Sequence, residues 1–160
     1  MIKKIIPIMV MILVLGSGYA FGLEVGLTGG AMSKKIDSGF HYGLAVTTGF
    51  LVPMVKFEFE VYKMKENVAT AAVAGKEKAL CVGVKFRPKL GSFAPYAIVG
   101  VGGEFDKFGF DFGDYHKFTF IGGGCHFFLM DMLSIRADIR VMHFKDMNKT
   151  RFSAGVFLHI

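Results

Sequence analysis

Residues 54–62 alternate without interruption between apolar and polar side chains. The apolar members are Val55, Phe57, Phe59 and Val61, and the residues between them are Lys56, Glu58, Glu60 and Tyr62. Because successive side chains of a β-strand point to opposite faces, this strand would present hydrocarbon on one face and ions on the other. The pattern is typical of a strand in a membrane β-barrel, which alternates between lipid and lumen.

The N-terminal residues have the pattern of a secretion signal. Lys3 and Lys4 form a basic start, an apolar run of eleven residues follows over 5–15, and small residues come next. The alternative is a membrane anchor, but a helix that spans a bilayer needs about twenty apolar residues. We therefore expect a cleavable signal peptide over residues 1–22, with cleavage after Ala20 or Gly22.

The remaining residues, 23–160, suit a single domain and contain eight alternating segments. Strands of soluble proteins have about five or six residues, whereas a tilted membrane strand needs about nine to eleven. Most of these segments are long enough for the membrane. They are residues 23–33, 38–51, 54–64, 79–88, 93–105, 116–129, 132–144 and 150–160.

The connections between these segments alternate in length. Residues 52–53, 89–92 and 130–131 are short connections, whereas residues 34–37, 65–78, 106–115 and 145–149 are longer on average and hold most of the loop lysines. Outer-membrane barrels have short periplasmic turns and longer external loops. We expect an all-β, eight-stranded antiparallel up-and-down transmembrane β-barrel with both termini on the periplasmic side.

Glycines and charges gather on the face opposite the apolar side chains, as expected for a narrow barrel interior. The segment 116–129 fits least well, because Phe118 and Phe120 fall on the glycine face. A β-bulge or an aromatic side chain packed inside the barrel would explain them.

The predicted interior contains five cations and five anions. Buried charges are tolerated when they are paired, so this balance predicts a lumen that is plugged by ion pairs and closed to large solutes. The alternative is the solvated outer face of a soluble barrel. The cations are Lys56, Lys85, Arg87, Arg136 and Arg140, and the anions are Glu24, Glu58, Glu60, Glu104 and Asp138.

The stretch 122–140 reads GGGCHFFLMDMLSIRADIR and resembles a hairpin of the small outer-membrane barrels of the OmpA, OmpX and opacity-protein type. The resemblance extends over nearly all of residues 23–160. It implies that Glu58, Lys85 and Arg136 correspond to three members of an interior cluster implicated in gating. His126 stands where the family usually has an acid.

The last segment resembles the assembly signal that the outer-membrane insertion machinery recognises, although the family usually ends in Phe and this chain ends in Ile160. The resemblance makes that machinery an expected partner. The residues of the signal are Phe152, Ala154, Val156, Leu158 and Ile160.

Cations gather at the predicted external end of the barrel. We expect them to contact membrane lipids, in particular lipopolysaccharide phosphates; the alternative is that they only keep the loops soluble. Residues 104–117, rich in aromatics and acids, could bind a host or surface ligand or could pack on themselves. The cations are Lys34, Lys35, Lys63, Lys65, Lys76, Lys78, Lys107, Lys117, Lys145, Lys149 and Arg151.

The sequence gives little support for catalysis or metal binding. Asp37, Ser38 and His41 lie near one rim, but their facing does not assemble a hydrolytic site. His143 and His159 are isolated on their segments, which favours packing over metal binding. We therefore expect no enzyme activity, no cofactor and no metal.

Cys81 and Cys125 face opposite ways on segments that are not neighbours, so we expect two free thiols. The net charge of +6 accompanies no recognition motif, so we expect no nucleic-acid partner.

These observations predict a protein of the bacterial outer membrane with a structural, envelope-integrity or adhesin-like role. The alternatives are a low-conductance channel, a soluble lipocalin-like carrier and a barrel enzyme that modifies lipids.

Overall fold

The computed structural model describes residues 22–33, 38–50, 52–66, 78–105 and 115–160. The predicted signal peptide lies outside them except for Gly22. The described elements are eight strands: β1 (Leu23–Ser33), β2 (Ser38–Phe50), β3 (Val52–Glu66), β4 (Lys78–Phe86), β5 (Phe93–Phe105), β6 (Tyr115–Met130), β7 (Leu133–Phe144) and β8 (Asn148–His159).

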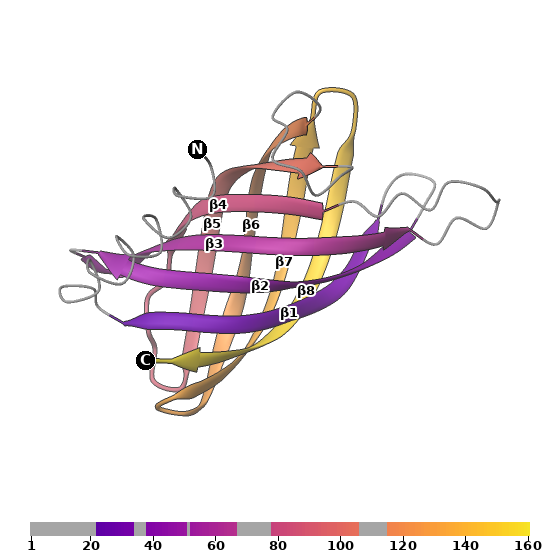
Figure 1. The fold of residues 1–160 in the computed structure, drawn as a ribbon. Coiled ribbons are helices and arrows are strands. Elements are labelled where there is room, and N and C mark those ends of the chain that lie inside the picture. The colour runs from indigo at the N-terminus through magenta and orange to yellow at the C-terminus, as the bar shows by residue number, and fades with distance from the viewer. Residues whose placement is uncertain (1–21, 34–37, 51, 67–77, 106–114) are drawn as a thin grey trace, which may run out of the picture.

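The strands form a closed barrel in sequence order, as Figure 1 shows. Each strand pairs antiparallel with the next, and β8 pairs with β1 from Glu24 opposite His159 to Ser33 opposite Thr150. Beyond that ladder, Leu23 and Ile160 exchange backbone hydrogen bonds of 3.1 and 2.8 Å. The structure therefore confirms the predicted eight-stranded antiparallel up-and-down barrel.

The strand ends differ from the prediction at several places. β1 and β5 have the predicted bounds, whereas β3 begins at Val52, so the predicted turn at residues 52–53 belongs to the strand. The register between β2 and β3 shifts between Gly49 and Phe50, where the pairing passes from Lys56 to Val52. This irregularity accommodates the extra residues of β3 next to the turn.

Two ends of the barrel can be told apart by their connections. At the turn end, the β4–β5 connection closes with a bridge between Leu90 and Phe93, and Gly91 has a φ of +65°. Glycine adopts this left-handed conformation without steric cost, which explains its place in a tight turn. The β6–β7 turn and the C-terminus lie at the same end. The opposite end, which we call the loop end, is where β1 stops at Ser33 and β4 starts at Lys78.

The outer wall of the barrel is a belt of exposed apolar side chains. The exposed fraction is 70% for Leu27, 59% for Val101 and 55% for Ile121. Soluble proteins rarely expose a continuous apolar surface of this extent. Among the described residues, no helix is long and apolar enough to cross a bilayer.

Glycines on the inner wall make room for aromatic rings. A Cβ at Gly100 would lie 2.5 Å from the ring of Phe120, and a Cβ at Gly102 would lie 2.4 Å from the ring of Phe118. Both rings are almost fully buried. The register between β5 and β6 is unbroken across them. Of the two explanations for these residues, the aromatic packed inside is therefore correct and the bulge is not needed.

Candidate functional site: the charged barrel interior

Glu58 is the centre of the interior charge network. It lies on β3 and is 2% exposed. Its carboxylate accepts hydrogen bonds from Lys85 on β4, from Arg136 Nη1 at 2.7 Å and from Arg140 Nη2 at 2.6 Å. The alternation of β3 points this side chain inward, and three cations from two other strands converge on it.

Glu60 repeats the arrangement one step closer to the loop end. It accepts hydrogen bonds from Arg140 Nη1 at 3.0 Å, from Arg151 Nη2 at 2.6 Å and from the hydroxyl of Thr28 at 3.0 Å. Arg140 therefore bridges the two glutamates. This crosslinks β3 to β7, and Arg151 and Thr28 extend the link to β8 and β1.

The sequence Arg-Ala-Asp-Ile-Arg on β7 places Arg136, Asp138 and Arg140 on one face, because alternate residues of a strand share a face. Asp138 Oδ2 lies 3.2 Å from Arg136 Nε and 3.0 Å from Arg140 Nη2, and it accepts a 2.8 Å hydrogen bond from Tyr96 on β5. The carboxylate therefore separates two guanidinium groups that would otherwise repel each other.

A second chain of polar contacts crosses the turn end. Glu24 on β1 accepts two hydrogen bonds from Arg87, one of them 2.7 Å long. Its carboxylate also lies 3.6 Å from His159 Nδ1. Ser134 Oγ lies 2.7 Å from His159 Nε2 and 3.1 Å from His126 Nδ1. These contacts join β1, β6, β7 and β8 across the lumen.

Lys149 and Arg151 correct the prediction for the external cations. Both side chains point into the barrel, with exposed fractions of 3% and 1%. Lys149 donates a 2.6 Å hydrogen bond to Glu104 near the loop end. Arg151 precedes the outward Phe152, and Lys149 is two residues before Arg151, so the alternation of β8 turns both side chains inward.

The predicted charge balance is therefore also wrong. All ten predicted interior charges are buried, as is His126, but Lys149 and Arg151 join them. Among the described residues the interior holds seven cations, counting Lys and Arg, against five anions. The Nε atoms of Arg140 and Arg151 are buried without a hydrogen-bond partner in the structure.

Polar residues that the sequence analysis did not assign to the interior complete the network. His41 is fully buried, and its Nε2 lies 3.0 Å from the hydroxyl of Ser153. The two residues approach each other across Gly30, which pairs with both of them. Strict alternation along β2 and β8 would have placed them inside.

Of the other lysines predicted at the external end, some are exposed and some are half-buried. Lys65, Lys117 and Lys145 are exposed, and Lys63 and Lys78 are half-buried. Lys34, Lys35, Lys76, Lys107 and most of the aromatic segment 104–117 lie outside the described residues. Of the predicted assembly signal, the four residues on β8 and Ile160 after it are all exposed.

No metal site is assembled by the described part of the chain, in which no three His, Cys, Asp or Glu side chains form a suitable group. Cys81 and Cys125 are both free, as predicted. Of the weak hydrolytic candidates, Asp37 and the side chain of Ser38 lie outside the described residues.

Ser134 contacts His159, and His159 contacts Glu24. A hydrolytic triad joins a nucleophile, a base and an orienting acid in the same order. Ser134 is 0% exposed and its hydroxyl is shared between two histidines. The Ser134 oxygen is therefore buried, and its contacts link β7 to β6 and β8.

No family model matches the sequence, and no curated protein matches it. Solved structures do match. The N-terminal β-barrel domain of Pseudomonas aeruginosa OprF has 12% identity and a TM-score of 0.63, with coverage of 86% of this chain and 97% of that one. The Yersinia pestis outer membrane protein Ail in a phospholipid nanodisc has 18% identity and a TM-score of 0.58, with coverage of 87% and 99%. Ail has also been solved in complex with the heparin analogue sucrose octasulfate.

A de novo designed transmembrane β-barrel matches at a similar level, with 13% identity, a TM-score of 0.60 and coverage of 87% of this chain and 95% of that one. Because a designed barrel also matches, the structural similarity concerns the architecture of the barrel. The chain has the fold of the small eight-stranded outer-membrane β-barrels.

Proposed function

We propose that this protein spans a bacterial outer membrane as a sealed barrel and that its role is structural or adhesive. One observation carries the proposal: the wall is apolar outside, whereas inside it holds buried charges that form ion pairs at the turn end, in the middle and at the loop end. An apolar outer belt fits lipid and does not fit the soluble carrier, whose exposed apolar wall would cause association in water.

The lumen is filled at three levels. Glu24, Arg87 and His126 occupy the turn end, the Glu58 cluster occupies the middle, and Glu104 with Lys149 occupies the loop end. Near the loop end, the rings of Phe118 and Phe144 pack with centroids 4.8 Å apart. Moving a solute through this interior would require breaking ion pairs in a low-dielectric space. This supports a sealed barrel over a pore.

Planar-bilayer recording tests the seal. We expect the refolded protein to give no steady conductance at neutral pH. The control for folding is gel mobility: a band that migrates differently before and after boiling shows that the barrel is closed. Steady openings in the wild-type protein would contradict the proposal. If the alternative of a low-conductance channel holds, it should prefer anions, because the described residues give the interior two more cations than anions.

For the adhesive role, we propose that the loop-end cations contact phosphate or sulfate groups on lipopolysaccharide or on a surface polysaccharide. Lys65, Lys117 and Lys145 are exposed at this end. A heparin analogue bound to Ail makes such a ligand reasonable for a barrel of this shape. Replacing the three lysines with Gln should weaken retention on immobilised heparin and lower its salt dependence. Unchanged elution would remove this part of the proposal.

We propose no catalytic role for the interior, because the Ser134 hydroxyl, which has a triad-like arrangement in the described part of the chain, is buried. A Ser134→Ala variant should therefore have the same esterase and phospholipase background as the wild type.

For assembly, we propose that the insertion machinery recognises the outward apolar residues of β8. A charged side chain in place of Val156 should therefore slow insertion.

A further inference from the structure

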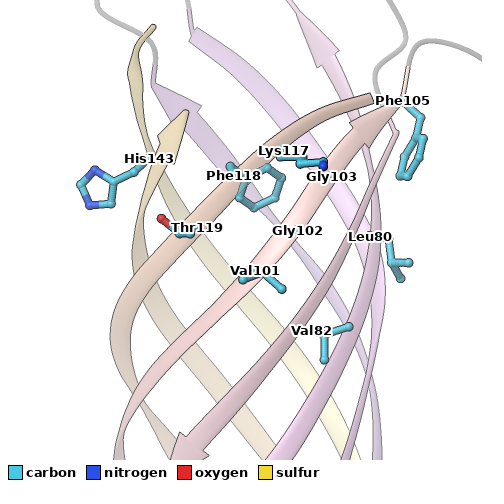
Figure 2. Close-up of a pocket in the computed structure, with 10 residues that line it drawn as sticks. All are labelled: Leu80, Val82, Val101, Gly102, Gly103, Phe105, Lys117, Phe118, Thr119 and His143. Carbon is cyan, nitrogen blue, oxygen red and sulfur yellow. The ribbon is translucent and has the colours of Figure 1, made fainter. Parts of the chain in front are cut away.

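The outer wall of the barrel has a hollow of about 560 Å³ near the loop end. We call it the outer-wall hollow, and Figure 2 shows its lining over β4, β5, β6 and β7. Its size lies within the range of small-molecule sites, about 300–1,000 Å³. Its lining residues are Leu80, Val82, Val101, Gly102, Gly103, Phe105, Lys117, Phe118, Thr119 and His143.

A missing side chain in a cross-strand row explains the hollow. Gly103 on β5 pairs with Leu80 on one side and with Lys117 on the other. The next row toward the turn end is complete, with Val82, Val101 and Thr119 side by side. Alternate residues of a strand share a face, so Gly103 is on the same outward face as Val101. The gap therefore lies between an apolar wall at Leu80 and a cation at Lys117.

The lining divides into an apolar part and a polar part. Leu80, Val82 and Val101 are exposed, with fractions of 40%, 36% and 59%. Lys117 stands closer to the loop end than Thr119, and His143 is held by Asn148 at 3.0 Å. Lys78 is at the loop end of β4 next to Leu80. Leu80 and Lys117 lie in one cross-strand row, and Phe105 lies beside Lys78 one row closer to the loop end. Val82 and Val101 lie one row toward the middle of the wall, so the apolar lining continues past the cations in that direction.

We propose that the outer-wall hollow binds an anionic lipid of the outer leaflet, with an acyl chain along Leu80, Val82 and Val101 and a headgroup phosphate at Lys117. The order of the lining residues matches a lipid, whose chains point to the middle of the bilayer and whose phosphate lies at the surface. The cationic margin complements the phosphate. The inference rests on the proposed membrane location but not on the adhesive role.

A tryptophan placed beside the hollow tests this directly, because the sequence contains no tryptophan of its own. Phe59 faces outward on β3 and pairs with Val82, so Phe59→Trp reports on the hollow without altering its lining. Phe152→Trp is the matched control. It is four residues from the loop end of β8, as Val82 is on β4, and its paired neighbours are Ala31 and Ile139.

Each variant is refolded into vesicles of dibrominated phosphatidylcholine, which quenches a nearby tryptophan, and unbrominated phosphatidylglycerol is added in steps. Relief of quenching gives the affinity of the anionic lipid relative to phosphatidylcholine. One cation near the surface corresponds to a preference of about fivefold. We expect that preference for Phe59→Trp and a ratio near one for Phe152→Trp.

Three further variants, all made with Phe59→Trp, separate the contribution of the headgroup from that of the acyl chain. Lys117→Gln should bring the ratio to about one, whereas Lys89→Gln, which removes an exposed cation at the turn end, should leave it unchanged. Thr119→Phe, which fills the hollow from the outer face, should also abolish the preference. A lipid with more phosphates, such as lipid A, should give a larger ratio at the same site.

Equal ratios at the two probes, or a preference that survives Lys117→Gln, would overturn the proposal. A probe on β3 that brominated lipid fails to quench, when the β8 probe is quenched, would mean that protein covers the hollow and would also overturn it. The shift of the unboiled gel band is recorded for every variant, so loss of the barrel is distinguished from loss of the lipid site.

Discussion

Glu58→Gln should be among the most damaging single changes in the barrel, although the two side chains have almost the same shape. The carboxylate of Glu58 is 2% exposed and receives Lys85, Arg136 and Arg140. An amide can accept hydrogen bonds from these groups but cannot neutralise them. Counted over the part of the chain that the structure describes, the substitution would change the interior from seven cations against five anions to seven against four.

The magnitude follows from the cost of an uncompensated buried charge, which is about 3–5 kcal/mol when one partner of a buried pair is removed. In urea, with a slope of about 2 kcal/mol per molar, this loss would lower the unfolding midpoint by about 2 M. Equilibrium unfolding in vesicles, followed by the gel shift of the folded band, measures it. Asp146→Asn, at an exposed carboxylate in the β7–β8 turn, is the control and should change stability by less than about 0.5 kcal/mol.

A second substitution distinguishes charge from packing. If the loss comes from excess positive charge, Lys85→Met in the Glu58→Gln background should restore part of the stability, with a coupling of about 1–3 kcal/mol. If the loss comes from altered packing, removing Lys85 should add a further loss. A Glu58→Gln variant as stable as the wild type, or a double variant less stable than Glu58→Gln alone, would refute the reasoning.

Three further predictions follow from the interior. Gly26→Ala should destabilise the barrel by about 1–3 kcal/mol, because the new Cβ would lie 2.4 Å from the ring of Phe157. Adding Phe157→Leu should recover much of this loss. Gly29→Ala, whose new Cβ would have its nearest contact at 3.5 Å, is the control in the same unfolding assay. Lys149→Met should cost about 3–5 kcal/mol, because it removes the cation that donates a hydrogen bond to the buried Glu104, whereas Lys145→Met should stay within about 0.5 kcal/mol in urea titrations. The buried thiol of Cys81, 3% exposed on the inner wall, should resist a water-soluble maleimide until the barrel unfolds; rapid modification of the folded protein, detected by mass spectrometry, would indicate a water-filled lumen.

The sequence predicted the fold well because strand alternation is a strong signal when one face meets an apolar solvent and the other does not. In β3, each of Lys56, Glu58 and Glu60 lies between apolar residues, so their shared face follows directly. The length of the segments and their number predicted the closed barrel, whereas the orientation inferred from short and long connections stays a prediction.

The same signal was not carried to the start of β8. Lys149 and Arg151 share the face of Ser153, opposite the exposed Phe152, so strict alternation along β8 would have placed both inside. Their ion partners depend on closure, which brings β8 beside β1 and Arg151 within reach of Glu60 on β3. Pairings that cross the lumen join residues far apart in the chain, and the alternation of single strands contains no information about them.

The partners in the network also explain why formal charge counting gave a misleading balance. Five cations against five anions suggested one partner each, yet Glu58 alone receives three cations and Glu60 receives two at hydrogen-bonding distance. A carboxylate has about four lone-pair positions and can serve several donors, so a small number of acids can hold a larger number of bases. The stability of such an interior depends on where the acids stand, and for that reason loss of Glu58 should cost far more than loss of any one of its cations.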